Sequence, residues 1–156
     1  MTQINGIDVI PLGNIFYNEH ARDGTWCCSP YQGHPHGCPN FKKGCTKKRP
    51  AFNSLRVEAY DWYAIVQEFD LKTHSEAMKR KLPDWSERQC RNPLYWQGSV
   101  RKTLREKCGK VGGDILLDIP EASGVEVFET MKVVGVILSR HPDIVKKVML
   151  VGRLKS

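Results

Sequence analysis

Four cysteines and two histidines lie within nineteen residues, between Cys27 and Cys45. Nine residues separate Cys28 from Cys38, and six separate Cys38 from Cys45. A loop with these spacings can wrap around one centre so that its thiolates converge. Thiolates are soft ligands that select zinc, Cu(I) or iron–sulfur clusters. The segment therefore predicts a metal centre.

The residues around these cysteines favour an iron–sulfur cluster over zinc. Pro39 follows Cys38, just as a proline follows the last cysteine of the bacterial ferredoxin run. A glycine precedes both Cys38 and Cys45, where it lets backbone amides approach the sulfur atoms. Zinc is the alternative, because His34 and His36 could complete a tetrahedral site. The sequence lacks the C-x2-C motif, two cysteines with two residues between them, that is usual in zinc sites. Zinc is therefore the less favoured metal.

The complete ligand set is a separate question. Cys27 and Cys28 are adjacent, and two neighbours rarely bind one centre together. Cys90 is a candidate fourth ligand, because it lies in the polar stretch RQCRNP. Cys108 instead continues an apolar stripe at helical spacing, so we expect it in the core. If only three cysteines bind, one metal position stays open, which is the feature that separates catalytic from structural sites.

Two groups of basic residues could attract an anion. Lys47 belongs to a group around Cys45, where positive charge also favours the thiolate form. Arg91 precedes an expected helix N-terminus, and Arg101 and Arg105 lie one helical turn apart, so these three could hold a phosphate or a carboxylate. The net charge of the chain is +7, which attracts nucleotides, nucleic acid and other anions. We therefore expect an anionic ligand of the nucleotide or nucleic-acid class.

Regular structure that could position these residues is expected on both sides of an irregular segment over 13–52. The patterns predict strands over 7–12, 55–69 (one or two), 115–119 and 145–151, and helices over 73–82, 86–91, 93–108 and from 123 to about 135. Capping boxes are expected at the 86–91 helix, from Asp84 with Glu87 or from Ser86 with Gln89, and at the last helix, from Ser123 with Glu126. Asn92 is the expected N-cap of the 93–108 helix, which Gly109 should end. This order indicates an α/β fold with a small sheet flanked by helices. The length of 156 residues fits one domain, 1–156, with residues 13–52 as a metal-binding loop and 53–156 as the α/β body.

Several classes of protein are disfavoured by the sequence. No apolar run reaches the roughly 20 residues of a membrane helix, and the N-terminus lacks the pattern of a signal peptide. We therefore expect a cytoplasmic protein that does not enter a membrane and whose cysteines stay reduced. A Walker loop, a G-x-G-x-x-G motif and an HExxH motif are all missing from the sequence.

Three stretches of the chain resemble a family of small cytosolic proteins that are known only as predicted metal-binding proteins of unknown function. Residues 26–40 follow the pattern WCxxPYxxHPxGCPN. Residues 87–106 are similar to the family's WSERQ…YWQG…R helix, and residues 121–136 to its pattern G-[IV]-[DE]-V-x-x-T-x-x-x-x-G. Together the similarity spans most of residues 24–136.

The resemblance implies a metal bound by Cys27, Cys38 and Cys45. It favours Cys27 over Cys28, because Cys27 directly follows the tryptophan of the motif. The chain departs from the family after Cys45, where threonine and lysine stand in place of two prolines. The family's activity is unknown, so the resemblance predicts a metal and no reaction.

Two functional hypotheses follow from the sequence. The first is an iron–sulfur protein that acts on, or beside, an anionic substrate such as a nucleotide or an RNA base. The second is a non-enzymatic, zinc-stabilised module that binds nucleic acid or protein through its basic loop. Whether the protein is an enzyme depends on whether a fourth protein ligand closes the metal site.

Overall fold

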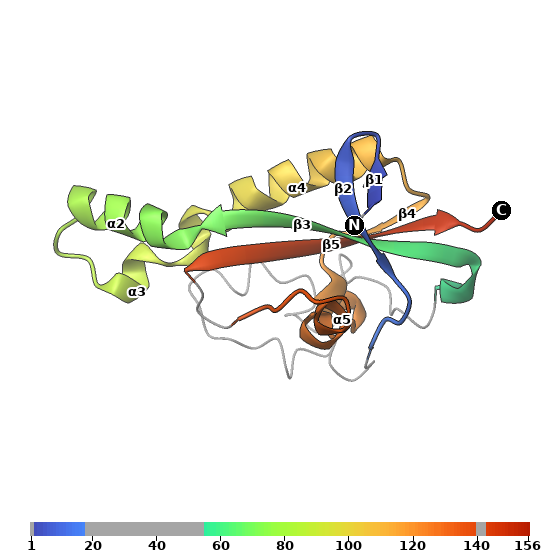
Figure 1. Cartoon of the computed structure of the whole chain (residues 1–156). Coiled ribbons are helices and arrows are strands. Elements are labelled where there is room, and N and C mark those ends of the chain that lie inside the picture. Colours follow the sequence, from blue (N-terminus) through green and yellow to red (C-terminus); the bar gives the residue numbers. More distant parts are fainter. Residues whose placement is uncertain (1, 18–54, 140–142) are drawn as a thin grey trace, which may run out of the picture.

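The computed structural model of this protein describes residues 2–17, 55–139 and 143–156. These residues form a five-stranded antiparallel sheet in the order β1-β2-β3-β5-β4, with helices on both of its faces (Figure 1). The strands are β1 (Thr2–Ile4), β2 (Ile7–Leu12), β3 (Tyr60–Asp70), β4 (Ile115–Leu117) and β5 (Ile144–Leu154). The helices are α2 (Leu71–Lys81), α3 (Glu87–Cys90), α4 (Gln97–Val111) and α5 (Val127–Val133). The predicted α/β fold, a small sheet flanked by helices, is confirmed.

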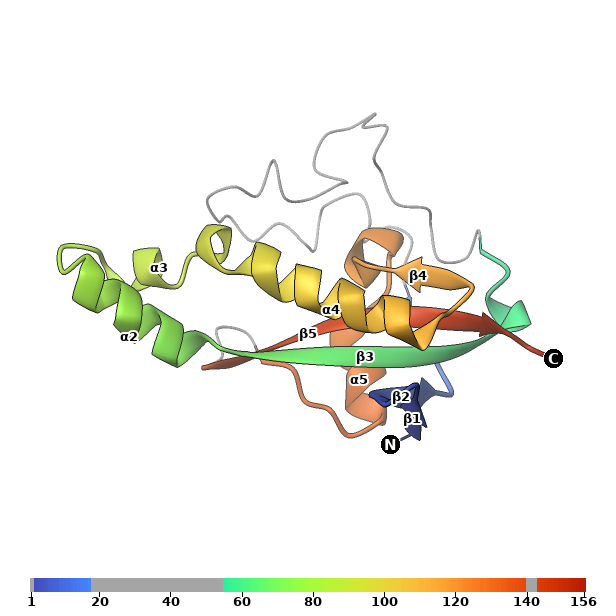
Figure 2. The same ribbon diagram turned by 90° about the horizontal axis from the view of Figure 1, so that it is seen from above.

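Strands β3 and β5 form the central ribbon of the sheet. They pair over their full lengths, from Tyr60 opposite Leu154 to Asp70 opposite Ile144. Strand β4 pairs with β5 only at residues 150–152, and Figure 2 shows it beside the C-terminal part of β5. The sequence predicted one or two strands over 55–69. One is observed, and it begins at Tyr60 because a 3₁₀ turn over Val57–Ala59 precedes it.

Helix α4 covers one face of the ribbon. Its buried residues Val100, Leu104 and Cys108 continue the stripe that begins at Trp96, which confirms the predicted core position of Cys108. Alternate residues of β5, Met149 among them, point toward this helix and share its core cluster. Burying each large apolar side chain contributes about 1.5–3 kcal/mol, so this stripe fixes α4 on the sheet.

Helix α4 differs from its predicted range at both ends. Residues Pro93–Tyr95 form a separate 3₁₀ turn, which the Asn92 side chain caps as predicted by accepting from the Leu94 amide. The helix then runs past Gly109 and ends at Gly112, whose φ of 71° is the left-handed conformation that glycine adopts readily. The predicted end at Gly109 was wrong by three residues, because that glycine keeps a helical conformation.

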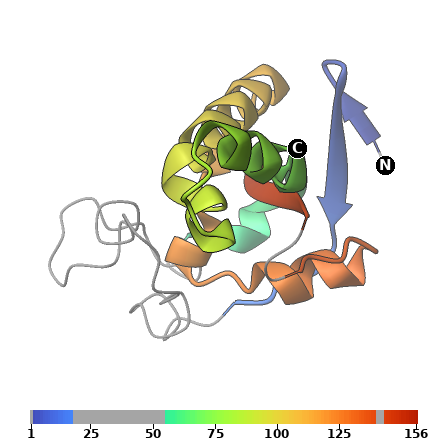
Figure 3. The ribbon, with the colours of Figure 1, turned by 90° about the vertical axis from the view of Figure 1, so that its left-hand side faces the viewer.

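Helix α5 covers the opposite face of the sheet. Its Val127 and Met131 pack in one core cluster with Val148 and Leu150 of β5. Figure 3, seen from the α2 end of the molecule, shows α4 and α5 on opposite sides of the ribbon. The predicted capping box between Ser123 and Glu126 was wrong. Ser123 ends a 3₁₀ turn over Pro120–Ser123, and the left-handed Gly124 changes the direction of the chain before α5 begins.

Helices α2 and α3 extend beyond the end of the sheet (Figure 1). The Asp70 side chain caps α2 by accepting from the Thr73 amide at 3.0 Å. The capping box predicted between Ser86 and Gln89 at the start of α3 is present in both directions. None of the helices in the described part of the chain has the length and apolar character that a membrane span requires.

Candidate functional site

A cleft of about 1080 Å³ lies along β5, between the N-terminal half of α4 on one side and α5 on the other. Its lining comes from seven parts of the chain: the start of α2, α3, the 3₁₀ turn after it, α4, the loop over 118–121, α5 with residues 137–139, and β5. The volume is at the upper end of the range of small-molecule sites, about 300–1,000 Å³. The fold therefore brings residues from distant parts of the sequence around one concave surface.

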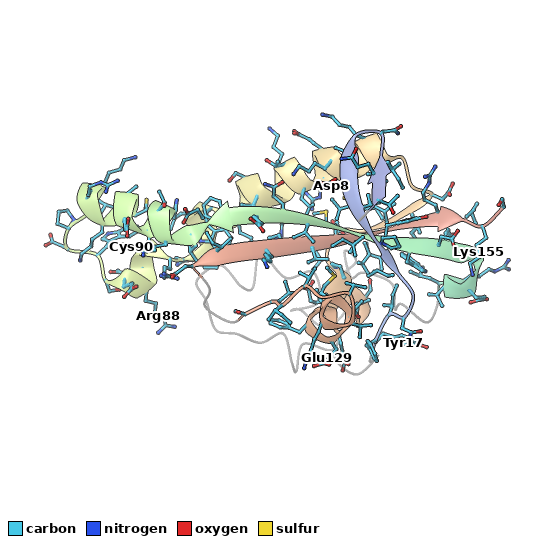
Figure 4. The ribbon with its side chains drawn as sticks, in the orientation of Figure 1. Asp8, Tyr17, Arg88, Cys90, Glu129 and Lys155 are labelled. Carbon is cyan, nitrogen blue, oxygen red and sulfur yellow. The ribbon has the colours of Figure 1, made fainter. Side chains whose placement is uncertain are left out.

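The charged lining of the cleft is mainly basic. Five cations contribute to it, against two carboxylates, and the lining members are Arg88, Arg91, Arg101, Lys146 and Lys147, with Asp118 and Glu121. The Arg88 side chain extends from α3 toward the side of the sheet on which α5 lies (Figure 4). A concave site with one prevailing sign of charge concentrates ligands of the opposite sign.

Of the basic residues predicted to bind an anion, Arg91 and Arg101 line this cleft. Arg105 does not line it, but its guanidinium donates to the Asp118 carboxylate at 3.0 Å, and Asp118 is a lining residue. Arg105 therefore holds the Asp118 side chain in place in the cleft wall, and the Asp118 carboxylate is paired with a cation from outside the lining. Lys47 lies outside the described residues.

Two cations of the cleft lining come together where α4 meets β5. With its amide oriented by its two neighbours, the Gln97 side-chain oxygen accepts from Lys147 Nζ at 2.5 Å and from Arg101 at 3.2 Å. The two cations thus share one neutral acceptor. Within the part of the chain that the structure describes, Arg101 has no carboxylate within ion-pair distance. An anion bound between Arg101 and Lys147 would accept a charge-assisted hydrogen bond from each of them.

Arg91, at the other end of the cleft, is in a different electrostatic state. Its guanidinium donates to Asp143 at 2.8 Å and lies 3.5 Å from Glu87. Its backbone carbonyl accepts from the Trp96 indole at 3.0 Å, which fixes α3 against the start of α4. Arg91 is therefore balanced by carboxylates, and its principal role in this geometry is to join α3 to the chain just before β5.

Apolar side chains form the two walls of the cleft. On the α4 side, Trp96 lines it and stacks on Phe69, with ring centroids 5.1 Å apart and an angle of 11° between the planes. On the α5 side, Phe128 and Ile137 line it and remain 46% and 60% exposed, which leaves apolar surface open to a ligand. Trp96 is therefore both a buried core residue and part of the cleft wall.

The cysteines predicted to bind metal divide into two groups. Cys27, Cys38 and Cys45 lie outside the described residues. Cys90, at the end of α3, is a free thiol that is only 1% exposed, and the described residues contain no group of three or more His, Cys, Asp or Glu side chains that could hold a metal ion. Cys90 as the fourth ligand therefore stays a prediction.

The buried surroundings of Cys108 keep its thiol protonated and unreactive. Burial raises the pKa of its thiol to about 11, and its sulfur lies 4.0 Å from Met149 Sδ in the core under α4. Metal ligation requires the thiolate, which this environment disfavours.

The sequence analysis missed Lys146, Lys147 and Gln97 as site residues. A signal for the two lysines was present, because they stand side by side in the first half of a strand that is otherwise apolar up to Gly152. In a strand, adjacent side chains point to opposite faces, so this pair places one cation on each side of β5. Gln97 could not have been found this way, since its role depends on the contact between α4 and β5.

Comparison with protein-family models, with curated proteins and with solved structures found no match. The resemblance of residues 26–40, 87–106 and 121–136 to predicted metal-binding proteins therefore stays a prediction. The function has to be argued from the residues and the geometry of the cleft.

Proposed function

We propose that this protein binds an anionic ligand in the cleft between α4, β5 and α5, and that it also carries a metal centre. The observation that supports the anion site is that Arg101 and Lys147 both donate to the Gln97 side chain, which brings two cations of the cleft lining close together. Both cations line a cleft that is walled by apolar groups, where electrostatic attraction is stronger than in open water. The ligand's anionic group is of the phosphate or carboxylate type.

The metal centre rests on the sequence of the 27–45 segment. Cys27, Cys38 and Cys45 are the proposed ligands, Cys90 is the candidate fourth, and an iron–sulfur cluster is favoured over zinc. A fully ligated cluster supplies electron transfer, whereas a cluster with an open iron position supplies a Lewis acid. Whether the protein acts on its ligand or only binds it depends on that fourth ligand.

Anion binding is tested by isothermal titration calorimetry of the full chain with inorganic phosphate and pyrophosphate at low ionic strength. Arg101→Gln and Lys147→Gln should each weaken binding by roughly tenfold, the loss of one charge-assisted hydrogen bond. Lys102→Gln is the matched control, because it removes the same charge from the adjacent, exposed position of α4 outside the cleft. Equal losses in Arg101→Gln and Lys102→Gln would show that only net charge matters and would reject the site.

The metal centre is tested by anaerobic purification followed by iron, sulfide and zinc analysis. We expect a brown protein that contains iron and sulfide, and Cys38→Ser should lose the metal. Cys108→Ala is the control that should keep it, because Cys108 lies in the core. A colourless protein with stoichiometric zinc would reject the cluster in favour of the zinc alternative, and unchanged metal in Cys90→Ser would remove Cys90 from the ligand set.

A further inference from the structure

One edge of β5 faces the cleft without a neighbouring strand among the described residues. Strand β3 pairs with β5 along its whole length, but β4 covers the opposite edge only at residues 150–152. The remaining residues of that edge, 144–149, all line the cleft. The cleft therefore occupies the place beside β5 that a longer β4 would take (Figure 2). We call residues 144–149 on this side the open edge of β5.

The backbone groups that point to the open edge can be identified from the hydrogen bonds at the other end of β5. Gly152 accepts from the Asp114 amide at 2.9 Å, and the Leu154 amide donates to Asp114 Oδ2 at 2.7 Å, so even-numbered residues face the β4 side. The Lys155 amide donates to the carbonyl of Ala59 at 2.9 Å, so odd-numbered residues face β3. The register of β3 and β5 is continuous, and backbone direction therefore alternates along the whole ladder.

By this alternation, Ile144, Lys146 and Val148 direct their N–H and C=O groups into the cleft. Residues two apart in a strand are separated by about 6.6 Å, so these three present their groups along roughly 13 Å of edge. Another extended chain has the same two-residue repeat and can pair with all three, whereas a small planar ligand covers only part of this length. The open edge is therefore suited to the addition of a peptide strand.

The side chains of an added peptide would alternate between the two walls of the cleft. Val148 packs in one cluster with Met131 of α5, so even-numbered β5 side chains point toward α5. Met149 packs in one cluster with Leu104 of α4, so odd-numbered β5 side chains point toward α4. Residues directly opposite each other on paired strands share a face. Peptide residues that hydrogen-bond with even-numbered residues of the open edge would therefore face α5, and the residues between them would face α4.

The two walls differ in their chemistry. On the α5 side, Phe128 and Ile137 line the cleft and are 46% and 60% exposed, so apolar peptide side chains would cover apolar surface there. On the α4 side, Arg101 donates to the neutral Gln97 side chain and has no carboxylate within ion-pair distance among the described residues. An acidic peptide side chain on this face would accept a charge-assisted hydrogen bond from Arg101. The walls therefore favour a peptide in which apolar and acidic residues alternate.

The recessed position of the open edge argues against the same edge of a second copy as the partner. The edge lies inside a cleft of about 1080 Å³, with α4 on one side and α5 on the other. In a second copy the edge is recessed in the same way, so two such edges could not approach to the strand spacing of about 4.8 Å. A single extended peptide can enter the cleft without this obstruction.

We infer that the open edge of β5 binds an extended peptide by strand addition, with apolar side chains toward α5 and an acidic side chain beside Arg101. The peptide runs antiparallel to β5, because this continues the direction of β4 and is the more stable pairing. This inference rests on the proposed anion site and names a peptide carboxylate as the anion. It predicts that the peptide backbone, and not only its charge, contributes to affinity.

The first experiment titrates the full chain with blocked hexapeptides by calorimetry at low ionic strength. A peptide of alternating valine and glutamate should bind at least roughly tenfold more tightly than one of alternating valine and lysine. Arg101→Glu should abolish this preference, although the chain stays net positive, and Lys102→Glu, at the exposed neighbouring position outside the cleft, should keep it. Equal effects of the two substitutions would overturn the inference.

Titration with inorganic phosphate separates this inference from the anion site on which it rests. Binding of phosphate without binding of either peptide would reject strand addition and leave the anion site intact. Binding of neither phosphate nor peptide would reject both.

The second experiment tests backbone pairing with two N-methylated forms of the valine–glutamate peptide. Valine residues that face α5 direct their amides to β5, so methylation of the valine amides should weaken binding at least roughly tenfold. Methylation of the glutamate amides is the matched control, because these amides point away from β5 and the affinity should be largely kept. Equal affinities of the two methylated peptides would contradict pairing with the open edge.

Hydrogen exchange of the unaltered protein locates the peptide and tests for other occupants of the edge. The amides of Lys146 and Val148 should exchange rapidly in the protein alone and slowly when the valine–glutamate peptide saturates it. The amide of Lys147, which faces β3, serves as the internal control. Slow exchange at Lys146 and Val148 before peptide is added would mean that the chain itself or a second copy covers the edge, and would overturn the inference.

Discussion

Arg91 in α3 donates a hydrogen bond of 2.8 Å to Asp143, the residue that directly precedes β5. The Asp143 side chain is 63% exposed and that of Arg91 is 22% exposed, so the pair lies at the protein surface. Its contribution to stability should be small, about 0.2–1 kcal/mol, as for other exposed ion pairs. Its larger consequence is electrostatic, because Asp143 neutralises one of the cations that line the cleft.

We therefore predict that Asp143→Asn strengthens phosphate binding and that Arg91→Gln weakens it, each by roughly threefold to tenfold. Calorimetry with inorganic phosphate measures both effects, and a double-mutant cycle of urea unfolding measures the stability of the pair. A loss of affinity in Asp143→Asn would mean that the pair positions the cleft more than it lowers its charge.

Cys108 should resist thiol reagents in the folded protein. Its pKa of about 11 leaves roughly one thiolate in a thousand at pH 8, and its side chain is buried. Cys108→Ser should lower the free energy of unfolding by about 1–3 kcal/mol, since it buries a hydroxyl in an apolar cluster. Cys108→Ala is the control for lost volume. Labelling with iodoacetamide followed by peptide mass spectrometry checks the reactivity, and rapid labelling under native conditions would contradict this environment.

His74 should make stability depend on pH in the mildly acidic range. Burial, followed by the charge of Lys81, lowers its pKa below the ordinary 6.5, and its Nε2 atom is buried without a hydrogen-bond partner among the described residues. The unfolded chain therefore takes up a proton at higher pH than the folded chain does. The free energy of unfolding should decrease as pH falls through 6.5 and level off below the folded pKa.

The variant His74→Phe isolates this effect, because it keeps an aromatic ring next to Phe69 and removes the titrating group. Urea unfolding of both proteins at pH values from 7.5 to 5 gives the comparison. The difference in unfolding free energy between variant and original protein should shift in favour of the variant as pH falls. A difference that stays constant over this range would contradict the assigned role of His74.

Gly152 is required by close packing within the sheet. A Cβ atom at this position would lie 2.6 Å from Ile115 Cγ2 and 3.1 Å from the Trp62 ring. Gly152→Ala should therefore lower the free energy of unfolding by about 1–3 kcal/mol. Gly98→Ala is the matched control: nothing described lies within 4 Å of its added Cβ, and alanine in a helix should stabilise by about 0.5–1 kcal/mol. Urea denaturation measures both, and equal effects would reject the packing argument.

Much of the local structure could be predicted from short stretches of sequence. The capping box at Ser86 and Gln89 and the cap at Asn92 depend on residues at most three positions apart, and both are present in the structure. The apolar stripe that ends at Cys108 has helical spacing, and it is buried as predicted. Local signals failed where two glycines could each end the same helix. Helix α4 continues through Gly109 and ends at Gly112, which adopts the left-handed conformation.

The sequence by itself therefore determined most of the elements, the core face of α4 and the cysteine-rich segment that predicts a metal. Only the tertiary structure decided that Lys147 lies beside Gln97 and Arg101, and that one edge of β5 opens into the same cleft. The physical reason is that helix caps and helical periodicity depend on neighbours a few residues apart. Strand order and the packing of α4 on β5 join residues some fifty positions apart, and no local pattern encodes their register.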